Sequence, residues 1–124
     1  MEQQKNILSL TINNKVNEVI DLISKKEVDL NIQDENGSTA LMIASYFNHL
    51  EITKALIEGG AELDIQNKKG DTALMLASYF NYPENVEALI KGGANKNIKD
   101  NEGKTALDIA KKENNKKLIE LLTN

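Results

Sequence analysis

The chain has 124 residues, which is enough for one domain that buries roughly two thirds of its unfolded surface. Its net charge of −4 is spread over interleaved Asp, Glu and Lys, and the chain contains no Arg. A nucleic acid is therefore not expected as a partner, because its phosphates would repel the negative charge and because the chain lacks the guanidinium groups that bind guanine with two hydrogen bonds. The absence of Cys excludes disulfides and thiolate chemistry.

An internal repeat organises the chain. Four sets of residues recur at a constant spacing of 33 residues: Gly37, Gly70 and Gly103; Thr39, Thr72 and Thr105; Leu41, Leu74 and Leu107; Ala44, Ala77 and Ala110. Such a period is typical of stacked repeats, in which each unit buries its apolar face only against its neighbours. We therefore predict a single domain, 1–124, with four units: 1–33, 34–66, 67–99 and 100–124.

The first unit, residues 1–33, is a divergent copy that we expect to form an N-terminal cap. A shift by one period aligns Leu8, Glu18, Val19, Ile23, Leu30 and Ile32 with Leu41, Glu51, Ile52, Leu56, Leu63 and Ile65. The unit lacks a turn signature at its start and carries several polar residues: Gln3, Gln4, Lys5, Asn13, Asn14 and Lys15. A polar terminal unit is what a stack of repeats needs at its end.

The second unit is predicted to form a turn followed by two helices. Residues 34–38, with the sequence DENGS, supply the turn, in which Gly37 can adopt a backbone conformation closed to most residues. Thr39 is expected to cap the first helix with its hydroxyl. Asn48 is expected to end that helix in the left-handed conformation, before a second helix at 50–58.

The third unit repeats this pattern and the fourth shortens it. Thr72 and Asn81 bound the first helix of the third unit, and a second helix is predicted at 83–91, where Pro83 needs no amide donor. Glycine pairs at 59–60 and 92–93 stop the second helices. The last unit, 100–124, has a set of lysines expected on its outer side and is predicted to be the C-terminal cap: Lys111, Lys112, Lys116 and Lys117.

These residues resemble the ankyrin repeat family. The family pattern runs Asp, two variable residues, Gly, one variable residue, Thr-Pro-Leu-His, an Ala pair, two variable residues and Gly-His; residues 34–99 follow it closely, and the end units match as caps. The resemblance implies an all-α solenoid of stacked helix-turn-helix units with β-turn fingers. This chain departs from the pattern by Ala40, Ala73 and Ala106 in place of Pro, and by Met42, Met75 and Asp108 in place of His. We therefore expect the hydrogen bonds of that His between turn and helix to be missing.

No catalytic residue, metal site or cofactor is expected. His49 is the only His and aligns with the His that starts the second helix in ankyrin repeats, so a structural role is favoured. The repeated Thr hydroxyls have no neighbouring base and are explained as helix caps. The acidic turns lack the alternating ligands of a calcium loop, and the glycine pairs lack the Lys-Ser or Lys-Thr of a phosphate loop.

The aromatic residues indicate a protein-binding surface. All five lie in two copies of SYFN, at 45–48 and 78–81, and at Tyr82. The family resemblance places the residues after the Ala pair at the end of the first helix, facing the groove, so they are expected to form an exposed aromatic strip of the kind that anchors interfaces. The predicted centre is Tyr46, Phe47, Tyr79, Phe80 and Tyr82. The predicted polar rim consists of the turn tips Glu35, Asn36, Ser38, Lys68, Lys69, Asp71, Asn101, Glu102 and Lys104.

Several functions remain open for such a surface. We expect binding of another protein through the concave face and the turn tips, as in a scaffold; a stoichiometric inhibitor or immunity-type protein would use the same face to block an enzyme. Alternatively, the strip mediates self-association of an otherwise monomeric chain, or the aromatic side chains only pack between repeats. A catalytic role would predict turnover that is lost in His49→Ala.

No segment is expected to insert into a membrane. The opening MEQQKN does not lead from a basic region into an apolar stretch. The longest apolar runs, ALMIA and ALMLA, are too short to cross a bilayer. We expect a cytoplasmic or otherwise intracellular location.

Overall fold

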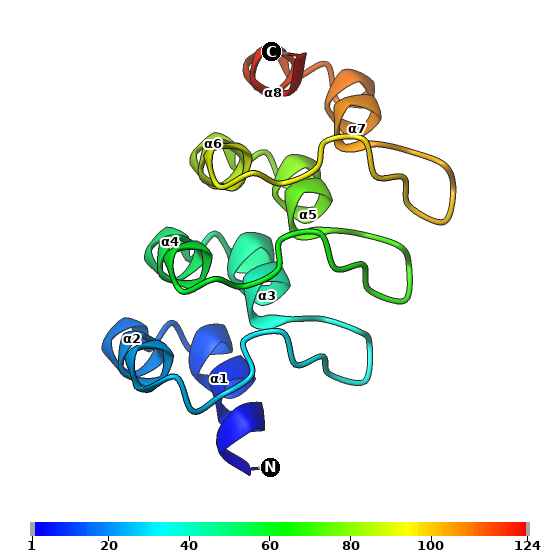
Figure 1. The fold of residues 1–124 in the computed structure, drawn as a ribbon. Helices are drawn as coiled ribbons and strands as arrows, with labels where there is room; N and C mark the ends of the chain where they lie inside the picture. The colour runs from blue at the N-terminus through cyan, green and yellow to red at the C-terminus, as the bar shows by residue number, and fades with distance from the viewer. Residues whose placement is uncertain (1, 124) are drawn as a thin grey trace.

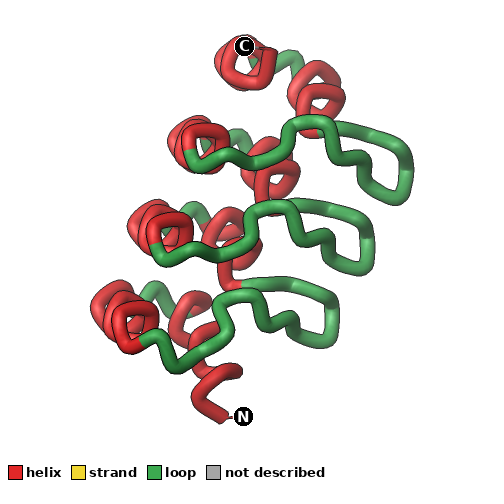
Figure 2. The backbone as a smooth tube through the Cα atoms, viewed as in Figure 1, coloured by secondary structure: helices red, strands yellow, loops and turns green. Residues whose placement is uncertain are grey.

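Pairs of helices stack in a ladder, with long loops that project to one side (Figures 1 and 2). The computed structural model describes the backbone of residues 2–123 and the side chains of residues 6–123. The inner helices, which lie next to the projecting loops, are α1 (Glu2–Ile12), α3 (Ala40–Phe47), α5 (Ala73–Tyr79) and α7 (Ala106–Lys112). The outer helices are α2 (Val16–Lys25), α4 (Leu50–Glu58), α6 (Pro83–Lys91) and α8 (Lys116–Thr123).

Each inner helix packs on the next inner helix, and each outer helix on the next outer helix. All regular secondary structure within residues 2–123 is helical, which confirms the predicted all-α solenoid. The side chains of Gln3, Gln4 and Lys5, expected in the N-terminal cap, lie outside the described residues. In the part of the chain that is described, no helix combines the length and the apolar character needed to cross a membrane.

The predicted helix starts are confirmed in the two central repeats, and so is the predicted end of α3, whereas α5 ends at Tyr79 with Phe80 as its C-cap, one residue before the predicted Asn81. Asn81 nevertheless has the left-handed conformation expected of it, with a φ of 57°. The hydroxyl of Thr39 accepts a hydrogen bond from Met42 N–H at 3.2 Å, and that of Thr72 accepts one from Met75 N–H at 3.3 Å. Such bonds satisfy one of the amides that a helix start leaves without a partner. Asn48 ends α3 with a φ of 58° in the left-handed region.

At the start of α7, the expected loss of turn-to-helix hydrogen bonds is wrong. Asp108 stands where the ankyrin pattern has His, and its Oδ2 accepts a hydrogen bond from Thr105 N–H at 2.9 Å. The hydroxyl of Thr105 accepts one in return from Asp108 N–H at 3.2 Å, which completes a capping box. The backbone N–H of Thr105, followed by its side chain, holds the pKa of the Asp108 carboxyl below its usual value.

The small side chains of the inner helices allow close packing between repeats. Four alanines on α3 and α5 are fully or almost fully buried: Ala40, Ala44, Ala73 and Ala77. Met42 and Met75 are buried beside them, where the ankyrin pattern has His. A core of apolar side chains thus runs without a break from the first helix pair to the last.

The first helix pair aligns with the second at a spacing of 34, which is one more than the period of the other units. Lys15 N–H donates to Leu10 O at 2.9 Å, as His49 N–H donates to Ala44 O at 2.8 Å. The first residues of α2 and α4 have the same spacing of 34. Four of the predicted pairings are therefore wrong by one residue, namely those of Leu8, Glu18, Val19 and Ile23.

One additional residue in the loop after α2 explains the shift. The left-handed residue Lys26 after α2, with a φ of 56°, corresponds to Gly60 after α4, with a φ of 91°. Leu30 and Leu63 are also equivalent. A Cβ added to Gly59, after α4, would lie 3.3 Å from Leu30, and a Cβ added to Gly92, after α6, would lie 3.3 Å from Leu63. Leu30 is four residues after Lys26, whereas Leu63 is only three residues after Gly60. This additional residue restores the spacing of 33, so the predicted pairing of Leu30 with Leu63 is correct.

Candidate functional site

Three fingers, formed by the turns at 33–39, 66–72 and 99–105, project beside the inner helices (Figure 1). Each finger is held by one side-chain oxygen that accepts two backbone N–H groups. Asp34 Oδ1 accepts from residues 36 and 38, Asn67 Oδ1 from residues 69 and 71, and Asp100 Oδ1 from residues 102 and 104, all at 2.8 to 2.9 Å. These bonds fix the tips, so the rim of the site is preformed.

Hydrogen bonds also join each finger to the next. Lys68 N–H donates to Asn36 O at 3.1 Å. Asn101 forms two hydrogen bonds to the second finger. Its backbone N–H donates to Lys69 O at 3.1 Å, and its side-chain Nδ2 donates to Lys68 O at 2.8 Å. The fingers therefore form a ladder whose spacing is set by the spacing of the repeats.

An aromatic strip of four half-exposed side chains lies at the ends of α3 and α5. The exposed fractions are 45% for Tyr46, 47% for Phe47, 41% for Tyr79 and 44% for Phe80. The ring of Tyr46 meets Phe47 edge-on at 4.9 Å and meets Phe80 of the next repeat edge-on at 4.8 Å. Three of the four rings are thus in continuous contact across the repeat boundary.

Tyr82 and Tyr79 have different surroundings from this group. Tyr82 is partly buried against the core and stacks on Phe80, with the ring centres 6.0 Å apart. Tyr79 lies beside the fingers, where it lines a cavity together with Asp71 and Asp100. The pKa of Tyr79 is raised, first by burial and then by these two carboxylates.

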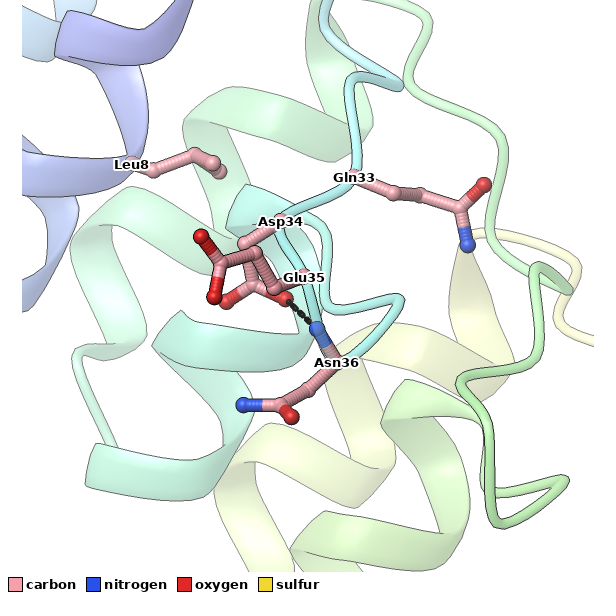
Figure 3. Close-up of a pocket in the computed structure, with 5 residues that line it drawn as sticks. All are labelled: Leu8, Gln33, Asp34, Glu35 and Asn36. Atoms are coloured by element: carbon pink, nitrogen blue, oxygen red, sulfur yellow. Dashed lines mark hydrogen bonds between the residues drawn. The ribbon is translucent and has the colours of Figure 1, made fainter.

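Three open cavities follow one another along the groove between the inner helices and the fingers. The first, of about 510 Å³, lies between Leu8 of α1 and the first finger, where Leu8 faces Asp34 and Glu35 (Figure 3). The second, of about 400 Å³, lies between the first two fingers and is lined by Tyr46, by both finger tips and by α3 and α5. The third, of about 460 Å³, lies between the second and third fingers.

The predicted rim residues surround these cavities, apart from Lys104. The first cavity has Glu35 and Asn36, the second has Asn36, Ser38, Lys68 and Lys69, and the third has Lys68, Lys69, Asp71, Asn101 and Glu102. Lys104 lies beside the third cavity, where its Nζ pairs with Glu102 Oε1 at 3.5 Å. Phe47, Phe80 and Tyr82 line none of the three cavities. Along the groove, the charge of the finger tips alternates from acidic to basic and back to acidic.

Asp71 differs from the other acidic groups of the rim. It is only 8% exposed, and among the described residues its carboxylate forms no hydrogen bond and no ion pair. Burial, followed by the negative charges of Asp100 and Glu102, raises its pKa above the usual value, while Lys69 acts in the opposite direction. The folded chain therefore carries a cost for the charge of this side chain.

We expect Asp71→Asn to raise the stability slightly at neutral pH, by less than about 1 kcal/mol, since the site is open to solvent. The folded pKa lies above the unfolded value of about 3.9, so the cost of the charge is present at neutral pH and is lost as the pH falls through the folded pKa. Urea unfolding at neutral and acidic pH measures this. The advantage of the variant should disappear below both pKa values, and a difference that is independent of pH would contradict the assignment.

Ile12 is a further exposed apolar side chain on the same side of the fold, which the sequence prediction missed. It is 50% exposed at the end of α1. At the longer spacing of the first helix pair it is the equivalent of Tyr46, so it extends the aromatic strip by one repeat. At the predicted spacing of 33 it falls on the buried Ser45, which is why the sequence did not reveal it.

His49 lies among structural contacts. Its ring stacks on Phe47 with the centres 5.7 Å apart, and its backbone carbonyl accepts the first hydrogen bond of α4 from Thr53 N–H at 3.0 Å. Its Nε2 is buried without a partner among the described residues. In that same part of the chain, no group of three or more His, Asp or Glu side chains is arranged to hold a metal ion.

The chain is similar to a known family of repeats over almost its whole length. A family model described as ankyrin repeats (3 copies) matches residues 6–100 and, in a second match, residues 59–124. Together these ranges contain the three fingers, the aromatic strip and Ile12. The similarity therefore covers every residue from which the groove is built.

Proposed function

The chain belongs to the ankyrin repeat family, whose members generally act as protein–protein interaction modules and typically are not enzymes, and from this premise we propose that it binds another protein in the groove between the inner helices and the fingers. The aromatic strip supplies the apolar centre of the interface, and the finger tips supply the polar rim. The surface is preformed by the hydrogen bonds within and between the fingers, so binding requires little ordering of the chain.

One observation carries the proposal, namely the contact of the exposed rings of Tyr46, Phe47 and Phe80 across the repeat boundary. A fully covered aromatic side chain buries ~150–250 Å². Four such side chains that are nearly half exposed, with Ile12 at the position equivalent to Tyr46 in the first repeat, approach the few hundred Å² at which an apolar patch is often a binding site. Packing between repeats alone would not require so much of these rings to remain in contact with solvent.

The charges at the finger tips favour a different protein over a second copy of the chain. In a two-fold dimer through this face, the two rows of fingers would run either parallel or antiparallel, and in both arrangements the second finger can face its own copy. Lys68 and Lys69 would then face the same lysines, and the acidic first finger would face either its own copy or the acidic third finger. Because like charges across an interface cost binding energy, a partner with a basic, acidic and basic order is a better match.

The proposal is tested by capture with matched variants. The native chain, a variant with Tyr46→Ala, Phe47→Ala, Tyr79→Ala and Phe80→Ala, and an Ile20→Ala control would be immobilised and exposed to a lysate of the source organism. We expect mass spectrometry to find a protein that the native chain and the control retain and that the fourfold variant loses by at least ~10-fold, as for the removal of an interface hot spot. Ile20 is a suitable control because it is an exposed apolar residue on an outer helix.

Circular dichroism must show that the fourfold variant keeps its helices. If the folded variant retains the same protein, the aromatic side chains serve packing and the proposal fails. A photo-crosslinking residue at position 47, compared with one at position 20, gives an independent answer in an otherwise native chain. Adding the chain to an activity assay of the partner then separates an inhibitor from a scaffold.

A further inference from the structure

The third cavity contains a carboxylate without a partner. Asp71 is more than nine-tenths buried, it lines the cavity of about 460 Å³ between the second and third fingers, and no described group donates a hydrogen bond to its side chain. Neither of its carboxylate oxygens is among the described polar atoms that are buried without a partner, so both are open to the cavity. Water can satisfy this carboxylate in the free chain, and a cationic group that enters the cavity can take the place of that water.

The other acidic groups of this cavity each have a partner within the third finger. Asp100 Oδ1 accepts the backbone N–H groups of Glu102 and Lys104 at 2.9 Å each. Glu102 pairs with the ammonium group of Lys104. Asp71 is thus the one carboxylate lining this cavity that has no partner at all among the described residues, and the negative charges around it add to the attraction for a cation.

The wall of the cavity also suits an organic cation. Tyr79 lines it with a ring that is 41% exposed, and an aromatic face attracts an ammonium or guanidinium group at close range. The carboxylates of Asp71, Asp100 and Glu102 do not form a group that could hold a metal ion within the described part of the chain. The chemistry of the cavity therefore favours a cationic side chain over a metal ion.

We propose that this cavity receives a Lys or Arg side chain of the partner protein, whose cationic group pairs with the Asp71 carboxylate and lies against the ring of Tyr79. The inference rests on the proposed function, because it names the chemistry that the partner presents at one end of the groove. Lys68 and Lys69 line the same cavity but form no ion pair with Asp71 in the described structure. These two lysines compete only weakly with another cation for the Asp71 carboxylate, since an exposed lysine loses side-chain entropy when it forms an ion pair.

The test uses isolated peptides, so that it does not depend on finding the partner. The probes are acetyl-Gly-Arg-Gly-amide, its lysine counterpart, and a citrulline counterpart that has nearly the shape of arginine without its charge. Each is titrated into the full chain and followed by the backbone amide signals of residues 68–71, 79 and 100–104 in nuclear magnetic resonance spectra. We expect saturable shifts confined to these residues with at least one cationic peptide, and binding at least ~10-fold weaker for Asp71→Asn, as expected when a hydrogen bond to a charged group is lost.

Two further variants serve as controls. Glu51→Gln removes one negative charge from the exposed start of α4, away from the fingers, and should leave the affinity unchanged. Lys69→Gln removes a competing cation and should strengthen binding. Because Asp71→Asn is expected to be at least as stable as the native chain, a loss of binding in this variant cannot be attributed to unfolding.

The outcomes are clear in each direction. The proposal stands if either cationic peptide binds more tightly than the citrulline peptide and depends on Asp71, and the two peptides distinguish a guanidinium site from an ammonium site. It is overturned if the three peptides behave alike, if none gives saturable shifts at tens of millimolar, or if Asp71→Asn binds as the native chain does. Failure here leaves the capture result with the aromatic variant untouched, and a negative capture result leaves the peptide titration untouched.

Discussion

Ile52→Ala is expected to lower the free energy of unfolding by about 3 kcal/mol, as is typical when a fully buried aliphatic side chain is truncated. Ile52 is 0% exposed on α4, which packs between α2 and α6. The cavity left by the substitution would weaken contacts within its own repeat and with the neighbouring repeats, on which a stacked chain depends. Denaturant unfolding followed by circular dichroism measures the loss.

Ile20→Ala is the matched control for this prediction. Ile20 also lies on an outer helix, α2, but it is 45% exposed. The same chemical change should therefore cost about 0.5 kcal/mol or less. Equal losses for the two variants would show that Ile52 is not in the core.

Gly70→Ala is expected to cost about 3 kcal/mol, because it combines backbone strain with a steric clash. Gly70 has a φ of 81°, in the left-handed region where a side chain adds about 1–2 kcal/mol. A Cβ at this position would stand 2.6 Å from both the backbone N and the Oδ1 of Asn101. Those atoms belong to the residue whose hydrogen bonds join the second and third fingers, so they cannot move without loss.

Gly103→Ala separates the strain from the clash. Gly103 has the same φ of 81°, but a Cβ there would have no neighbour within 4 Å. We expect this variant to lose only the strain energy of about 1–2 kcal/mol. Amide hydrogen exchange at Asn101 should be accelerated in Gly70→Ala and nearly unchanged in Gly103→Ala, and similar exchange in both would refute the proposed clash.

The helix starts of the central repeats and the end of α3 were predictable because local interactions set them. Thr39 and Thr72 accept hydrogen bonds from amides three residues later, and Asn48 adopts the left-handed conformation that few other residues tolerate. These preferences can be read from a few neighbouring residues. The capping box of Asp108 is equally local, and the sequence already contained its Thr-x-x-Asp spacing.

The register of the first helix pair was not predictable from the repeat spacing. The first unit shares few residues with the others, so one additional residue before Leu30 left no clear mark in the sequence. The hydrogen bond from Lys15 N–H to Leu10 O and the starts of α2 and α4 reveal the spacing of 34. This shift of one residue hid Ile12, because the side chain at each position of a helix faces a different direction from its neighbour.

The sequence alone determined that the chain is a stack of four helical units with aromatic residues at the ends of two inner helices, because a regular repeat period and local capping residues admit few other folds. Only the tertiary structure decided which contacts each of those aromatic residues makes. It joins Tyr46 to Phe80, turns Tyr79 toward the fingers and leaves the Asp71 carboxylate without a partner among the described residues. These features depend on contacts between residues about one repeat apart, and the identical SYFN copies have different surroundings because their neighbouring fingers carry different charges.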